Sequence, residues 1–133
     1  MKKFFYPKSI AVVGASADEE KVTNNIISNL QEMGFTGPIY PVGRAGGEVF
    51  GLPIYRSIKD IPVAVELLVI MVPADLVPGL FADAGEAGID RVVLITAGFN
   101  ELGGQGDNLT KRIIDIAKKY SIRFIGPNCQ GVI

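Results

Sequence analysis

The sequence contains no histidine and a single cysteine, Cys129, among its 133 residues. Without histidine, this chain has no histidine-based catalytic triad, no histidine metal site and no phosphohistidine. One cysteine excludes an internal disulfide and a multi-cysteine metal site, and this count suits a reducing cytoplasm. Thirteen basic and 14 acidic residues give a formal net charge of -1, which excludes a strongly basic nucleic-acid binder.

Long apolar runs are also lacking. The longest one, at 63–74, is interrupted by Glu66 and by Pro73, and it is too short to cross a bilayer. The apolar residues at the start of the chain end at Pro7, with no small-residue cleavage site behind them, so we expect no signal peptide. The sequence therefore predicts a soluble cytoplasmic domain whose partners include neither a membrane nor nucleic acid.

Short apolar runs and helical spacing alternate along the chain, which predicts one domain over 1–133. Runs typical of buried strands lie at 9–14, 38–42, 66–72, 91–96 and 122–125, with a minor extended piece at 52–55. Apolar residues at helical spacing lie at 22–33, 76–84 and 109–120. The order β-α-β-β-α-β-α-β predicts an α/β fold, with a parallel sheet, right-handed crossovers and helices on both faces.

Local signals refine these boundaries. Pro41 lies inside the second strand, and proline cannot donate to a ladder, so that strand is predicted at an edge or to end there. Asp75 is the predicted N-cap of the second helix, with Gly85 or Gly88 as its stop. Glycine-rich loops are predicted at 43–51 and 97–106, and a single helical turn at 57–61.

Ligands of open parallel sheets bind beyond the carboxyl ends of the strands, where the strand order reverses. The segments predicted at that rim are 14–16, 42–44, 72–74, 96–99 and 126–128. Their small residues let a ligand approach backbone N–H groups, and a following helix N-terminus favours an anion. The turn Gly14-Ala15-Ser16 is thus the predicted phosphate cradle. Purely structural roles, with Gly14 turning the chain and Ser16 capping the turn, stay open.

The first turn departs from the dinucleotide fingerprint. Counted from Gly14, the pattern G-x-G-x-x-G has Ser16 and Glu19 at its other two glycine positions. The P-loop pattern is absent as well, which argues against direct hydrolysis of a nucleoside triphosphate. No acidic residue follows the second strand to hold a ribose diol. Arg44 lies there instead, and it suits the 2′-phosphate of NADP or the 3′-phosphate of coenzyme A, unless it is an ordinary surface arginine.

Five segments that follow one another in the chain carry a resemblance to a known family. They are SIAVVGAS at 9–16, MGFTGPIYPV at 33–42, VPA at 72–74, TAGFNE at 96–101 and IGPNCQGV at 125–132. From about Phe5 to Ile133 the chain resembles the N-terminal coenzyme A-binding domain of the nucleoside-diphosphate-forming acyl-CoA synthetases. These include ADP-forming acetate–CoA ligase and, more distantly, succinyl-CoA synthetase alpha subunits.

The resemblance implies a Rossmann-like sheet that binds coenzyme A rather than a dinucleotide. Full enzymes of this family convert an acyl-CoA, phosphate and a nucleoside diphosphate into the free acid, coenzyme A and the triphosphate. They work through an acyl phosphate and a phosphorylated histidine that belongs to a later domain. We therefore expect this chain to be the coenzyme A-binding module of a longer protein. Its partners would be downstream ligase domains or a partner subunit, and it would not be catalytic alone.

The resemblance also implies which residues contact coenzyme A. The residues implied at the phosphates are Ser16, Lys21 and Val22; beside the adenine or pantetheine, Val72, Pro73 and Ala74; and along the pantetheine arm, Thr96, Ala97 and Gly98. The sequence departs from the family pattern at Thr23, where glycine is usual, and at Gly43-Arg44-Ala45, where Asn-Pro-Lys is usual. Two interpretations stay open: the basic group is shifted by one position to Arg44, or the phosphate site lacks a key contact and binds coenzyme A poorly. Two other functions stay open: a sensor of coenzyme A or another nucleotide, for example fused to an acetyltransferase, and an NADP-linked redox domain.

Overall fold

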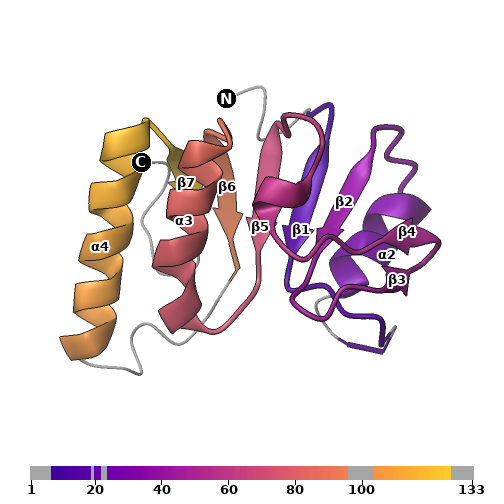
Figure 1. Ribbon diagram of the computed structural model, residues 1–133, viewed down its shortest axis with the longest axis horizontal. Helices are drawn as coiled ribbons and strands as arrows, with labels where there is room; N and C mark the ends of the chain where they lie inside the picture. Colours follow the sequence, from indigo (N-terminus) through magenta and orange to yellow (C-terminus); the bar gives the residue numbers. More distant parts are fainter. Residues whose placement is uncertain (1–6, 19, 22–23, 96–103, 127–133) are drawn as a thin grey trace.

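The computed structural model of the protein describes residues 7–18, 20, 21, 24–95 and 104–126. Five parallel strands form one sheet in the order β2-β1-β5-β6-β7 (Figure 1). Their bounds are β1 Ile10–Val13, β2 Ile39–Val42, β5 Leu67–Ile70, β6 Arg91–Leu94 and β7 Arg123–Ile125. The parallel sheet predicted from the apolar runs is confirmed. β2 is an edge strand, as Pro41 predicted.

The strand order reverses beside β1. From β1 the chain passes to β2 on one side, whereas β5, β6 and β7 follow one another on the other side. Ile10 of β1 is in register with Ile39 of β2 and with Leu67 of β5. The carboxyl ends of β1, β2 and β5 therefore meet at one rim, which is where open α/β sheets bind their ligands.

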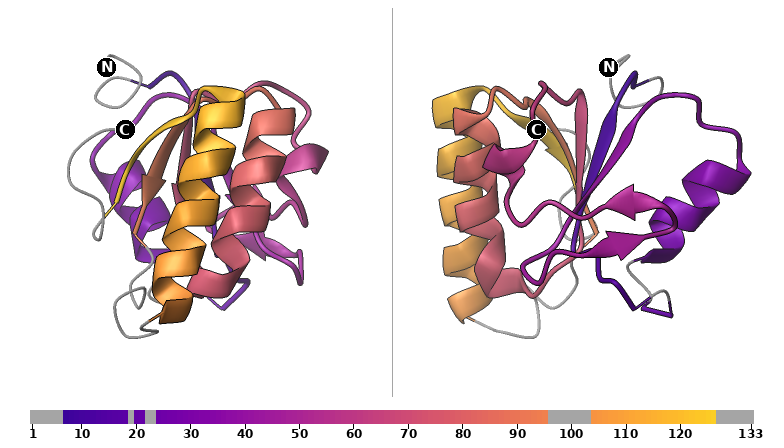
Figure 2. Two further views of the ribbon diagram at one scale, coloured as in Figure 1. Left: turned by 90° about the vertical axis from the view of Figure 1, so that its left-hand side faces the viewer. Right: turned by 45° about the vertical axis from the view of Figure 1, so that its right-hand side comes forward.

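Helices cover both faces of the sheet, as predicted. α2 (Asn24–Glu32) lies on one face, and α3 (Val77–Glu86) and α4 (Gly104–Tyr120) lie side by side on the other (Figure 2). Alternate residues of β1 enter two separate cores: Ile10 and Val12 pack in the core that contains Ile27 of α2, and Ala11 and Val13 in the core that contains Phe81 of α3. Because both faces are covered, β1 is apolar throughout.

The predicted loop at 43–51 is partly wrong, because it contains a strand. β3 (Glu48–Val49) pairs with β4 (Leu52–Pro53) in an antiparallel hairpin. The two residues between them, Phe50 and Gly51, have φ of 50° and 80°, as a tight two-residue hairpin turn requires. Phenylalanine rarely takes that conformation, so Phe50 did not indicate a turn. The helical turn expected at 57–61 is confirmed as η1 (Ile58–Asp60).

The ends of the later helices differ from prediction. Asp75 is not the N-cap of α3: it lies within a short 3-10 turn, η2 (Ala74–Leu76), and α3 begins at Val77 without a side-chain cap. Gly88, with φ of 79°, follows the end of α3, so it is the stop rather than Gly85. α4 begins at Gly104, inside the predicted 97–106 loop, because helical apolar spacing starts only at its second turn. No helix within the described ranges is long and apolar enough to cross a membrane.

Candidate functional site

A cavity of about 690 Å³ opens at the carboxyl ends of β1, β2 and β5. Its walls come from these strand ends, from the start of α3 and from α4. Six of the residues predicted as binding residues line it: Gly14, Ala15, Ser16, Lys21, Arg44 and Val72. Pro73 and Ala74 follow Val72 but do not line the cavity, and Ala74 is buried in the core under α3. Val22, Thr96, Ala97 and Gly98 lie outside the described residues.

The backbone N–H groups of the turn after β1 are hydrogen-bonded within the protein. The N–H groups of Gly14 and Ala15 both donate to the carbonyl of Val42, over 2.9 and 3.0 Å. The Ser16 N–H donates to Oδ1 of Asn24 over 3.2 Å. These three N–H groups therefore already have partners, and the prediction that the turn cradles a phosphate stays a prediction. Gly14 has φ of 112°, so its structural role in turning the chain is confirmed.

Asn24, the first residue of α2, holds the loop that follows this turn. Its side chain is fully buried, and Nδ2 donates to the carbonyls of Ser16 and Asp18, each over 2.7 Å. Its backbone N–H donates to the carbonyl of Lys21 over 3.0 Å. Sequence reasoning missed Asn24 because it sits on the polar side of the apolar spacing. Its position at a helix start, where asparagine caps are common, was the available signal.

Further short-range hydrogen bonds connect the described residues between Ser16 and Lys21. Ser16 Oγ accepts from the Asp18 N–H, and Asp18 Oδ1 accepts from the Glu20 N–H, both over 3.1 Å. The Lys21 N–H donates to the Asp18 carbonyl over 3.1 Å. Such side-chain turns fix a loop locally. The backbone of Lys21 is therefore held by hydrogen bonds, while its side chain is exposed.

The segment after β2 brings two arginines to the cavity. The Gly43 N–H donates to the Tyr55 carbonyl over 2.8 Å, and the Tyr55 N–H donates to the Pro41 carbonyl over 2.9 Å. These bonds place Arg44 and Arg56, each the next residue along, at the same rim, and both line the cavity. A Cβ on Gly43 would collide with the Ala15 carbonyl oxygen, so glycine is what lets this segment lie against the first turn. Sequence reasoning did not identify Arg56.

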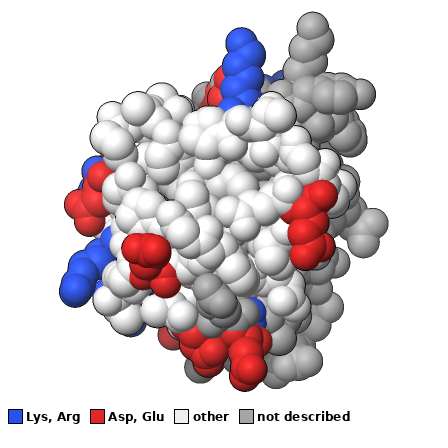
Figure 3. Space-filling model, turned by 90° about the vertical axis from the view of Figure 1, so that its right-hand side faces the viewer, with Lys and Arg blue, Asp and Glu red and all other residues white. Residues whose placement is uncertain are grey.

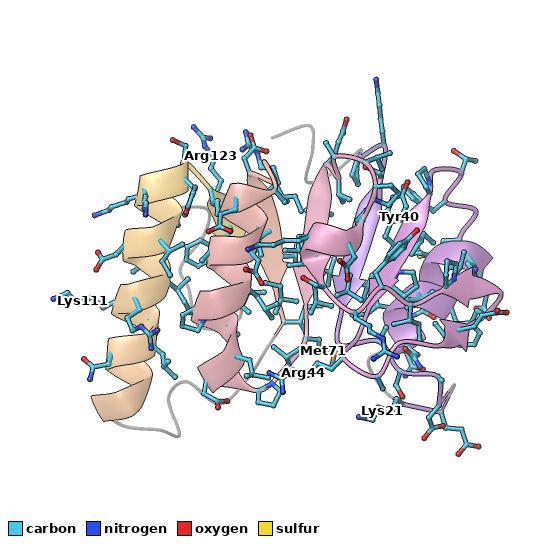
Figure 4. All side chains as sticks on the ribbon, viewed as in Figure 1. Lys21, Tyr40, Arg44, Met71, Lys111 and Arg123 are labelled. Carbon is cyan, nitrogen blue, oxygen red and sulfur yellow. The ribbon has the colours of Figure 1, made fainter. Side chains whose placement is uncertain are left out.

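The cavity is lined by four basic side chains and two carboxylates. The basic ones are Lys21, Arg44, Arg56 and Arg112 of α4, and the acidic ones are Asp75 and Asp83. Within the described part of the chain, none of the four basic groups is ion-paired; Asp83 lies 3.6 Å from Lys59 instead. Figure 4 shows Lys21 and Arg44 at the end of the sheet where the strands finish. With four basic groups against two carboxylates, the site favours an anionic ligand.

The surface over α2, β3 and β4, by contrast, has an uncharged centre (Figure 3).

A smaller hollow of about 420 Å³ lies at the other rim, between η1 and the end of α3. The Nζ of Lys59 lies 2.6 Å from a carboxylate oxygen of Glu86 there. This hydrogen bond and the attraction between the charges raise the pKa of Lys59 and lower the pKa of Glu86. Both side chains are half exposed, so water screens the pair. No residue predicted to bind a ligand lies in this hollow, and we take the larger cavity as the candidate site.

Comparisons with known proteins identify the family. The family described as CoA binding domain matches residues 8–133. The chain belongs to this family. The coenzyme A-binding domain is 41% identical over 133 residues to the ADP-forming acetate–CoA ligase I of Archaeoglobus fulgidus. It is 44% identical over 130 residues to the alpha subunit of the ADP-forming acetate–CoA ligase II of Pyrococcus furiosus. The resemblance inferred from the sequence motifs is thus confirmed.

A solved structure agrees with this assignment. The dinucleotide-forming acetyl-coenzyme A synthetase 1 of Candidatus Korarchaeum cryptofilum, in its apo form, matches with a TM-score of 0.87 and 40% identity. The match covers 98% of the coenzyme A-binding domain and 28% of that chain. The match to the Archaeoglobus ligase covers the whole domain and 19% of the ligase. The match to the Pyrococcus subunit covers 98% of the domain and 28% of the subunit. The Rossmann-like fold and coenzyme A as the bound molecule are confirmed.

The lining of the site combines apolar surface with charged groups. Its described lining consists of strand ends, glycines, apolar side chains, hydroxyl groups, four basic side chains and two carboxylates. Within the described ranges, no three His, Cys, Asp or Glu side chains gather closely enough to hold a metal ion. Such a lining can hold a ligand that is apolar in part and anionic in part, which matches the pantetheine and the phosphates of coenzyme A.

Proposed function

We propose that the domain binds coenzyme A in the 690 Å³ cavity, with the phosphates held by side-chain cations. The observation that carries the proposal is the set of four basic groups, without ion-pair partners in the described residues, at the rim where the strand order reverses. A charge-assisted hydrogen bond contributes roughly 1.5–3 kcal/mol when it is well ordered. Because the N–H groups of the first turn are already bonded, Lys21, Arg44 and the hydroxyl of Ser16 are the groups that meet phosphate.

The apolar part of the lining accommodates the rest of the ligand. Val72 follows β5 and faces the cavity together with Val13, Val42 and Leu80. Apolar and aromatic surfaces with a few polar groups are typical of cofactor sites, so we place the adenine or pantetheine against Val72. The contacts predicted for Pro73 and Ala74, and those predicted for Val22 and for Thr96, Ala97 and Gly98, stay predictions.

We further propose that the domain supplies the coenzyme A site of a cytoplasmic nucleoside-diphosphate-forming acyl-CoA synthetase. Two relatives that it matches over at least 98% of its length are ADP-forming acetate–CoA ligases. The domain has no histidine, so the phosphorylated histidine and the nucleotide site would come from downstream domains or a partner subunit. In that arrangement this chain positions coenzyme A, and the partner domains carry out phosphoryl and acyl transfer.

The test is calorimetry and thermal unfolding of the 133-residue protein with coenzyme A, NADP and NAD. A ligand that binds only the folded state stabilises it by about 2.7 kcal/mol at a hundredfold excess over Kd. We expect coenzyme A to bind and to raise the melting temperature, and NAD to do neither. If millimolar coenzyme A leaves the melting temperature of the folded protein unchanged, the assigned site is wrong. A shift with NADP alone would favour the redox alternative.

A further inference from the structure

Arg56 follows a residue that pairs with the end of β2, the strand that precedes Arg44. Tyr55 forms a parallel bridge with Val42, the last residue of β2. Backbone bonds from Gly43 to Tyr55 and from Tyr55 to Pro41 fasten the two segments on both sides of this bridge. Arg44 and Arg56 follow directly after these bonded residues, so one hydrogen-bonded unit presents both side chains to the cavity.

Gly46 lets the side chain of Arg56 lie against the turn that carries Arg44. The Gly46 N–H donates to the Gly43 carbonyl over 3.1 Å, which closes this turn. Gly46 is buried, with φ of 66°. A Cβ on Gly46 would lie 3.0 Å from Nε and 3.5 Å from Cζ of Arg56. The side chain of Arg56 therefore passes close to Gly46, and a larger residue at this position would crowd it.

Two guanidinium groups that line one cavity repel each other, and an anion bound between them removes that repulsion. Within the described residues neither arginine is ion-paired or hydrogen-bonded through its side chain. A phosphate monoester is the natural occupant, because its oxygens accept hydrogen bonds from two planar guanidinium forks at once. The pair also lies at the end of β2, the place where related α/β sheets hold the adenosine ribose of a bound cofactor.

We propose that Arg56 and Arg44 form a two-arginine site that selects ligands carrying a phosphate on the adenosine ribose. This inference rests on the proposed function and adds a residue and a specificity to it. In coenzyme A the group is the 3′-phosphate, and dephospho-coenzyme A lacks it. Lys21, on the separate loop after β1, is left for the pyrophosphate. Discrimination between the two ligands is then a property of the segment after β2.

The experiment compares the binding of coenzyme A and dephospho-coenzyme A by calorimetry in the 133-residue protein and its Arg56→Gln variant. We expect Arg56→Gln to weaken coenzyme A binding about five- to tenfold, and dephospho-coenzyme A binding less than about twofold. Arg56→Lys keeps the charge but loses the planar fork, so its loss should fall between these values. Arg123→Gln is the matched control, because Arg123 is exposed at the opposite end of the sheet (Figure 4). It should change neither affinity by more than about twofold.

A double variant, Arg44→Gln with Arg56→Gln, tests whether the two side chains share one phosphate. Groups that contact the same ligand atom are coupled, so the combined loss should differ from the product of the single losses. Equal losses for both ligands in Arg56→Gln, or no loss for either, would overturn the inference while leaving coenzyme A binding intact. If the unsubstituted protein binds neither ligand, the proposed function fails and the inference fails with it.

Discussion

The loop after β1 and the segment after β2 line the same cavity, yet they offer a ligand different groups. In the loop, the N–H groups of Gly14, Ala15 and Ser16 are all bonded within the protein. The segment after β2 is bonded along its backbone as well, but it presents the side chains of Arg44 and Arg56. A dinucleotide domain of this general fold reads phosphate with backbone N–H groups at its first turn. Here the N–H groups of the first turn are bonded within the protein, and we propose that recognition shifts to side chains.

The largest effect should come from breaking the support of the first loop with Asn24→Ala. This change removes three hydrogen bonds of a fully buried amide and leaves the Ser16 and Asp18 carbonyls without partners. We expect the free energy of unfolding to fall by roughly 2–4 kcal/mol. Urea denaturation measures it, with exposed Asn29→Ala on the same helix as the control, expected within about 0.5 kcal/mol. A loss below about 1 kcal/mol would show that Asn24 does not hold the loop.

Gly43 allows the segment after β2 to lie against the turn after β1. We expect Gly43→Ala to push these two segments apart. The new methyl group meets the Ala15 carbonyl oxygen, and a forced shift of this kind costs about 1–3 kcal/mol of folding free energy. Coenzyme A and dephospho-coenzyme A should lose affinity together, because both segments move. Gly79→Ala is the contrasting control: a Cβ there meets open space within a helix. That change should stabilise the protein by about 0.5–1 kcal/mol. A stable Gly43→Ala protein with unchanged binding would contradict the close approach.

Removing one cation from the segment after β2 should affect binding and leave folding unchanged. Arg44→Ala should weaken coenzyme A binding by about five- to tenfold, since an exposed charged hydrogen bond contributes about 1 kcal/mol. Dephospho-coenzyme A should bind almost as before, and higher salt should narrow the difference between the ligands. Calorimetry of both proteins with both ligands makes the comparison. Equal losses for the two ligands would mean that Arg44 acts through the fold or through another phosphate.

The smallest effect is expected at the opposite rim, where Glu86→Gln removes the partner of Lys59. The lowered pKa of Glu86 means that this carboxylate stabilises the fold above its ordinary pKa of 4.5. That contribution disappears as the pH falls through the lowered folded-state pKa. Urea denaturation of both proteins should therefore show a small difference at pH 7 that vanishes in acid. Coenzyme A affinity should stay unchanged; a change would mean that charge anywhere on the surface matters, and the contrast between the two rim segments would lose its meaning.

The sequence was sufficient for the sheet and for part of the site. Buried parallel strands are apolar throughout, so their positions were plain, and Pro41 predicted the edge strand. Arg56 and Arg112 could not be placed, because each reaches the cavity through contacts between segments distant in the chain. The bonding of the first turn could not be read from the sequence for the same reason. Its N–H groups are taken by Val42 and Asn24, and a motif of small residues does not show which donors are already bonded.

The single carbonyl of Val42 accepts two N–H groups, those of Gly14 and Ala15, and so ties the end of β2 to the end of β1. Both bonds are made within the protein, so a ligand is not needed to hold this junction. A binding surface that is already ordered loses little conformational entropy on association. Encounter is then governed by diffusion and by the attraction between the exposed cations and an anionic ligand. In stopped-flow experiments, charge substitutions at this rim should therefore slow association as well as speed release.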